Sequence, residues 1–172
     1  MLSPNKKTDN LTRKVALSGI LTCLALVFSY VEHLIPIPFP VPGVKLGLAN
    51  LVVLSGLYIL SPVNVLLILT ARVILAAFMF GNLSSLAFSL CGGILSFFVM
   101  LSLKRTLSFS KISVSIAGGA AHNLGQFAVA FFFLKSKALL IYLSPLILLG
   151  ALSGALIGII CAAVSKYFKS LN

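Results

Sequence analysis

Six long apolar runs follow one another along the 172 residues of the chain, with short breaks between them. A helix needs about 20 predominantly apolar residues to cross the hydrocarbon core of a bilayer. These runs are apolar on every face, whereas the strands of a membrane β-barrel alternate apolar and polar residues. The sequence therefore predicts an all-α integral membrane bundle of about six transmembrane helices. The runs cover residues 15–35, 46–60, 63–80, 84–103, 112–134 and 138–164.

The composition indicates one small membrane domain. Hydrophobic residues make up 60% of the chain and charged residues 9%, and the mean hydropathy is +1.17, outside the range of soluble domains. We expect residues 1–14 to form a cytoplasmic N-terminal tail and residues 15–172 to form a single six-helix transmembrane domain. The second run is short, so its helix could be tilted or partly re-entrant.

Basic residues gather on one side of the predicted bundle. Short cytoplasmic loops collect Lys and Arg, and an even number of helices brings both chain ends to the same side. Both termini are therefore predicted to be cytoplasmic. The formal charge of +11 then reflects loops that face anionic lipid headgroups, not nucleic acid. The residues on this side are Lys6, Lys7, Arg13, Lys14, Lys104, Arg105, Lys111, Lys166 and Lys169, and Lys45, Lys135 and Lys137 lie opposite.

Four polar or charged residues, Arg72, His122, Asn123 and Gln126, lie inside apolar runs. Such side chains are costly at bilayer depth and usually face the bundle interior or an aqueous cavity. His122 and Gln126 are four residues apart and share a helix face. We predict that these residues line one cavity near the middle of the membrane. Alternatively, Arg72 pairs with Glu32 or with carbonyl groups of a broken helix, and the polar residues of the fifth run join helices by hydrogen bonds.

Further polar residues are predicted at the outer ends of the helices. Four prolines in residues 36–42 exclude a helix there, and we expect an extended lid over an outward-facing pocket. The positive charges of Arg72 and Lys45 outnumber the negative charge of Glu32, and this balance favours a small polar or anionic ligand. Alternatively, Lys45 anchors the chain at the interface, and Glu32 marks a helix end that reaches water. The predicted substrate-binding residues are Arg72, His122, Asn123, Gln126, Lys45, Asn82, Asn50 and Glu32.

Small residues form faces that allow close approach between helices. The glycines of the fourth, fifth and sixth runs are expected to pack inside the bundle. Small residues also recur in the first run, near the predicted cytoplasmic side, where they form either an internal face or a docking surface for a partner membrane protein. The predicted docking residues are Ser18, Gly19, Thr22 and Cys23.

Acidic residues are almost absent, since the chain contains only Asp9 and Glu32. Mg²⁺-dependent diphosphate chemistry uses clustered carboxylates to hold the metal ions. ATP hydrolysis normally needs a phosphate-cradling loop such as GxxxxGK[ST], which the sequence lacks. We therefore predict no enzymatic activity, no catalytic residue, no metal site and no cofactor. Energy for any transport must come from a partner or an ion gradient.

Five segments carry a family resemblance: residues 42–50 (PGVKLGLAN), 71–72 (AR), 80–85 (FGNLSS), 88–96 (FSLCGGILS) and 118–126 (GGAAHNLGQ). They resemble the bacterial Gx transporter family, whose members are often labelled heptaprenyl diphosphate synthase component I. That family is similar to the S components of energy-coupling factor (ECF) importers, six-helix proteins of the plasma membrane with cytoplasmic termini.

The resemblance implies a lid between the first two helices and an outward-facing substrate pocket. It also implies that the first helix meets a transmembrane coupling subunit, which is powered by two ATPases. An Ala-x-x-x-Ala pattern is expected on that helix. Ala16 and Ala25 do not form it here, and the four predicted docking residues supply small side chains instead.

Three hypotheses about function follow. The first is an S-component-like subunit that binds a small polar or anionic metabolite for uptake, with a link to isoprenoid, quinone or flavin metabolism. The second is a non-catalytic membrane accessory, component I, of a heptaprenyl diphosphate synthase, which would associate with the synthase subunit. The third and weakest is an autonomous proton-coupled carrier that uses His122 or Glu32.

Overall fold

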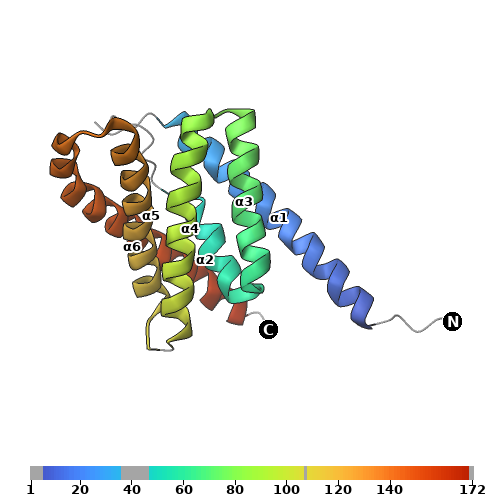
Figure 1. The fold of residues 1–172 in the computed structure, drawn as a ribbon. Coiled ribbons are helices and arrows are strands. Elements are labelled where there is room, and N and C mark those ends of the chain that lie inside the picture. The colour runs from blue at the N-terminus through green and yellow to red at the C-terminus, as the bar shows by residue number, and fades with distance from the viewer. Residues whose placement is uncertain (1–5, 36–46, 107, 171–172) are drawn as a thin grey trace.

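The computed structural model describes residues 6–35, 47–106 and 108–170, and within them the chain is helical, without strands (Figure 1). This confirms the predicted all-α fold. The predicted lid and Lys45 lie outside the described residues. The elements are α1 (Lys6–Leu34), α2 (Asn50–Ile59), α3 (Pro62–Met79), α4 (Leu83–Arg105), α5 (Lys111–Leu134), the 3-10 helix η1 (Lys137–Tyr142) and α6 (Leu143–Ser170).

Four of the described helical segments are long and apolar enough to cross a membrane: α1, α3, α4 and the segment formed by η1 and α6. α2 has 10 residues, so it rises about 15 Å, half the thickness of the hydrocarbon core. α5 has 24 residues and therefore the length to span, but the polar residues in its middle reduce its hydropathy. α1 already begins at Lys6, so residues 6–14 of the predicted tail continue the helix.

Side-chain caps explain where three of the helices begin. The side chain of Ser61 accepts a hydrogen bond from the backbone N–H of Asn64, and Pro62 occupies the first position of α3. Asn82 and Ser110 cap α4 and α5 in the same way. Caps of this kind satisfy N–H groups that have no partner in the first turn of a helix.

The start of α1, the end of α6 and the α4–α5 connection lie on one side of the bundle, and the α3–α4 connection and η1 lie on the other (Figure 1). α2 occupies only the half of the bundle nearer the chain ends. The prediction of orientation places the first three of these segments on one side of the membrane. Which side faces the cytoplasm stays a prediction.

Glycines bring α5 into close contact with α4 and α6. A methyl carbon added at Gly150 of α6 would lie 2.5 Å from the carbonyl oxygen of Gly119, and one added at Gly125 would lie 2.8 Å from the backbone of α4. Glycine allows helix backbones to approach this closely. The prediction that these glycines pack inside the bundle is confirmed, and their packing fixes the position of the polar face of α5.

The main apolar core lies around α2, which packs against α3, α4 and α6. It includes Leu54 and Leu57 of α2, Leu69 of α3 and Met100 of α4, all almost completely buried. α1 is peripheral, and its N-terminal half extends away from the other helices (Figure 1). The large apolar side chains of that half are exposed, as at Val15, and therefore face lipid or a partner.

Candidate functional site

The first polar cluster joins α1, α3 and the turn before α2. Nη1 of Arg72 donates a hydrogen bond of 3.2 Å to Oγ of Ser29, and Glu32 interacts electrostatically with the guanidinium. Oε1 of Glu32 accepts a hydrogen bond of 2.6 Å from the backbone N–H of Leu48. Arg72 is 5% exposed and Glu32 is 8% exposed. Buried charges require compensation, and Glu32 lies close enough to act electrostatically on the guanidinium; the direct pairing of Arg72 with Glu32 stays a prediction.

The second polar cluster centres on one face of α5. The amide nitrogen of Gln126 lies 3.2 Å from Nε2 of His122, and because an amide nitrogen cannot accept, it donates this hydrogen bond. Nδ2 of Asn123 donates a hydrogen bond of 2.9 Å to the carbonyl oxygen of Leu146 in α6. Asn50, the first residue of α2, lies against the same cavity as His122 and Asn123. The structure thus brings four of the predicted site residues together.

The cavity between α2, α4, α5 and α6 is small. Its volume is about 10 Å³, and polar side chains in its lining include Asn50, Ser115, His122 and Asn123. A space of this size accommodates about one water molecule. Binding of a metabolite at this place therefore requires the surrounding helices to separate.

Some buried polar atoms have no hydrogen-bond partner among the described residues: Oδ1 of Asn50, Oε1 of Gln126, Oγ of Ser96 and Nε of Arg72. Buried polar atoms are nearly always paired, so exceptions indicate where water or a ligand is accepted. Asn50 and Gln126 offer neutral acceptor oxygens. Both oxygens can accept a hydrogen bond from a water molecule or a ligand. The sequence does not single out Ser96 as a site residue, because a serine in an apolar helix resembles a small packing residue.

Two predicted site residues are not part of these clusters. Asn82 is exposed, and its side chain accepts a hydrogen bond of 2.8 Å from the backbone N–H of Ser85, so it caps α4. Lys45 lies outside the described residues. Within the described part of the chain, no group of three His, Cys, Asp or Glu residues is placed to hold a metal ion.

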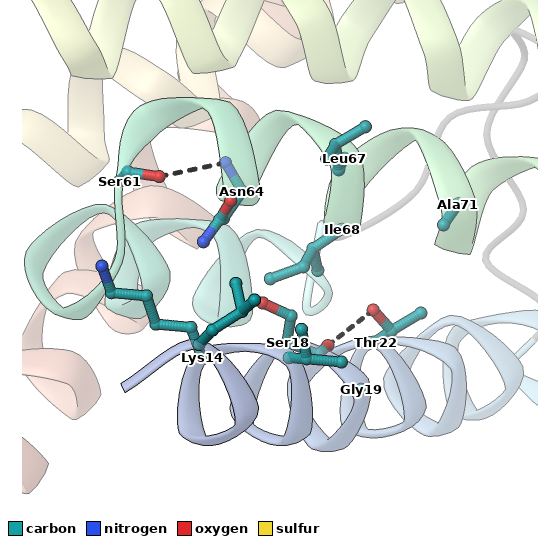
Figure 2. Close-up of a pocket in the computed structure, with 11 residues that line it drawn as sticks. Lys14, Ser18, Gly19, Thr22, Ser61, Asn64, Leu67, Ile68 and Ala71 are labelled. Carbon is teal, nitrogen blue, oxygen red and sulfur yellow. Dashed lines mark hydrogen bonds between the residues drawn. The ribbon is translucent and has the colours of Figure 1, made fainter. Parts of the chain in front are cut away.

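A separate groove of about 620 Å³ lies between α1 and α3 (Figure 2). Three of the four predicted docking residues line it: Ser18, Gly19 and Thr22. The hydroxyl of Thr22 donates to the carbonyl oxygen of Ser18 over 2.8 Å, which satisfies it within α1. Cys23 is exposed but is not part of this lining.

The α3 side of the groove was not found from the sequence. Asn64 and Ile68 of α3 face the small residues of α1, and Lys14 lies at the end nearer the N-terminus (Figure 2). An added methyl group at Gly19 would meet no atom within 4 Å, so the groove is open at this point. Its size falls within the range of about 300–1,000 Å³ typical of occupied pockets.

Comparisons with known proteins agree with this architecture. The fold is similar to that of a solved protein described as the S component of a bacterial ECF transporter, with a TM-score of 0.75 and 16% sequence identity. The similarity covers 94% of this chain and 98% of that chain. No curated protein sequence matches the chain significantly. The sequence pattern of the family described as heptaprenyl diphosphate synthase component I matches residues 21–164, and the chain therefore belongs to that family.

Proposed function

We propose that this chain is the substrate-binding S component of an importer in the bacterial plasma membrane. The observation that carries the proposal is the similarity of fold to an ECF S component over nearly the whole length of both chains. The groove between α1 and α3 adds support, because it presents small residues of a peripheral helix to a partner in the membrane. In this proposal the chain ends and the α4–α5 connection face the cytoplasm.

The proposed partner is a transmembrane coupling subunit that docks in the α1–α3 groove. Gly19→Leu tests this docking, because the open space at Gly19 lets the variant fold while its side chain fills the groove. Ala128→Leu is the matched control, since Ala128 is an exposed position of α5 outside the groove. We expect Gly19→Leu to lose the partner and Ala128→Leu to retain it.

The test is affinity capture of the tagged protein from its native membrane in mild detergent, followed by mass spectrometry of the associated proteins. Recovery of a coupling subunit with paired ATPases from the parent and from Ala128→Leu, but not from Gly19→Leu, would support the proposal. Recovery of the same proteins with both variants would contradict docking in the groove. Recovery of a soluble prenyl diphosphate synthase without ATPases would overturn the importer proposal itself.

We further propose that the ligand is a small polar metabolite that meets Asn50, His122, Asn123 and Gln126. These side chains are neutral hydrogen-bonding groups. Glu32 acts electrostatically on the guanidinium of Arg72, so we expect the first polar cluster to add little net charge to the site. An anionic ligand would bind only if the guanidinium of Arg72 moved away from Glu32 to meet it, or if another cationic group contacted it.

Small molecules that copurify with the protein can identify this ligand after denaturation and mass spectrometry. Gln126→Leu should reduce the amount of the bound molecule at least about tenfold, because it removes the buried acceptor Oε1. Asn82→Ala is the control, since Asn82 caps α4 away from both clusters. Equal recovery from parent and Gln126→Leu would show that the ligand lies elsewhere, and loss in Asn82→Ala alone would place it at the α3–α4 turn.

The family description favours a second candidate, a membrane accessory of a heptaprenyl diphosphate synthase. The two candidates would be connected if the imported metabolite were a precursor for isoprenoid, quinone or flavin metabolism. The accessory role predicts that synthase activity in reconstituted membranes falls when this chain is omitted. Unchanged activity would remove this candidate.

A further inference from the structure

Two lysines converge on one aromatic ring at the end of the bundle where the chain ends lie. Nζ of Lys104 in α4 is 5.1 Å, and Nζ of Lys111 in α5 is 4.8 Å, from the ring centroid of Tyr58 in α2. Nζ of Lys104 also donates a hydrogen bond to the backbone carbonyl of Leu57. Both lysines are half-buried, so their ammonium groups are held in place by the fold.

The chain places no described acidic side chain beside this pair. Of the two acids in the sequence, Glu32 accepts a hydrogen bond from the N–H of Leu48, in the first polar cluster. Asp9 belongs to the N-terminal end of α1, which extends away from α4 and α5 (Figure 1). Lys111 is also the first residue of α5, a position where the helix dipole favours an anion. Among the described residues, no carboxylate therefore neutralises these two ammonium groups, and they are able to bind an anion from outside the chain.

We propose that Lys104 and Lys111, held by the ring of Tyr58, bind the phosphate of an anionic phospholipid headgroup. The α4–α5 connection is short, is flanked by the basic residues Lys104, Arg105 and Lys111, and follows directly after a helix that is suited to span the membrane. This places the lysine pair at the membrane–water boundary, where headgroup phosphates lie. Two ammonium groups donate charge-assisted hydrogen bonds to phosphate oxygens.

Exposed apolar side chains continue inward along both helices, as at Phe98 of α4 and Ile116 of α5. They provide surfaces for the acyl chains of the same lipid. The site is independent of the proposed transport function, since it shares no residue with the polar clusters or the groove.

Native mass spectrometry of the purified full chain in neutral detergent tests the site. Dioleoyl phosphatidylglycerol is titrated as the anionic probe, and dioleoyl phosphatidylcholine as the zwitterionic probe. We expect the parent to bind phosphatidylglycerol more tightly, and the double variant Lys104→Gln/Lys111→Gln to weaken that binding at least about tenfold. The control is Lys135→Gln/Lys137→Gln, which removes the same charge at the opposite end of the bundle.

Lys111→Gln alone serves if the double variant does not fold, because it keeps the hydrogen bond from Lys104 to Leu57. A several-fold loss of phosphatidylglycerol binding in this variant supports the proposal, as does retained binding in Lys104→Arg/Lys111→Arg. Equal binding of both lipids, or an equal loss in the control, overturns it. Displacement of phosphatidylglycerol by millimolar inorganic phosphate would show a site for soluble phosphate and would equally overturn the lipid assignment.

Discussion

Replacing Gly150 by alanine should destabilise the bundle, because the new methyl group would meet the backbone of α5. The methyl carbon would lie 2.5 Å from the carbonyl oxygen of Gly119 and 2.9 Å from the side-chain nitrogen Nδ2 of Asn123. Non-bonded atoms pack at about 3.5 Å or more. The helices α5 and α6 must therefore separate by about 1 Å around this position.

The expected cost follows from what that separation removes. Overpacking of a filled interior costs about 1–3 kcal/mol, and the upper part applies here because a backbone oxygen cannot rotate away. Separation also weakens the hydrogen bond from Asn123 to Leu146, which contributes about 1 kcal/mol. Alanine returns up to about 1 kcal/mol through its greater helix propensity. We expect the free energy of unfolding to fall by about 2–3 kcal/mol.

Gly19→Ala is the matched control, since its methyl group would meet no atom within 4 Å. It should leave stability unchanged or raise it by up to about 1 kcal/mol. Unfolding by sodium dodecyl sulfate in mixed micelles can be followed by the reaction of buried Cys161 with a fluorogenic maleimide. The exposed Cys23 and Cys91 are replaced by serine in every sample. If Gly150→Ala is as stable as the parent, the close approach of α5 and α6 is refuted.

Three further substitutions can be measured in the same detergent system. Glu32→Gln should lower the free energy of unfolding by about 3 kcal/mol, because the buried guanidinium of Arg72 loses its acidic neighbour; an unchanged unfolding midpoint would contradict the pairing. Asn123→Leu should cost about 1 kcal/mol through the lost hydrogen bond to α6, and a variant as stable as the parent would show that this bond contributes nothing. Ser110→Ala should cost about 1 kcal/mol by removing the N-cap of α5, and circular dichroism during unfolding would reveal the loss.

The helices could largely be predicted from the sequence, because apolar runs, caps and proline positions are local signals. α3, α4 and α5 begin and end within two residues of the predicted runs. α1 differs, since it begins at Lys6 and not at residue 15. Hydropathy indicates only the part of a helix that lies in the hydrocarbon core. The helix itself continues into the basic segment before the apolar run, because Lys and Arg are good helix formers in water.

The predicted site was only partly accessible to the same reasoning. The spacing of His122 and Gln126 predicts their common face, and the structure places their side chains 3.2 Å apart. The pairing of Arg72 with Glu32 stays a prediction, although Glu32 acts electrostatically on the guanidinium. The size of the cavity depends on how side chains of four helices fill space, which no local pattern encodes. Asn82 was predicted to bind substrate, but its side chain is exposed and caps α4. An asparagine that caps a helix and one that binds a ligand cannot be distinguished in a sequence.

The polar face of α5 also bears on how the protein is made. Until α6 has been synthesised, Asn123 has no access to the carbonyl oxygen of Leu146, and Gly119 lacks the α6 backbone against which it packs. α5 also has a lower hydropathy than α3 and α4, because His122, Asn123 and Gln126 lie in its middle. Its stable insertion therefore depends on α6, the helix that follows it along the chain. Nascent chains that stop before α6 would leave α5 poorly anchored, and membrane proteases would be expected to remove them.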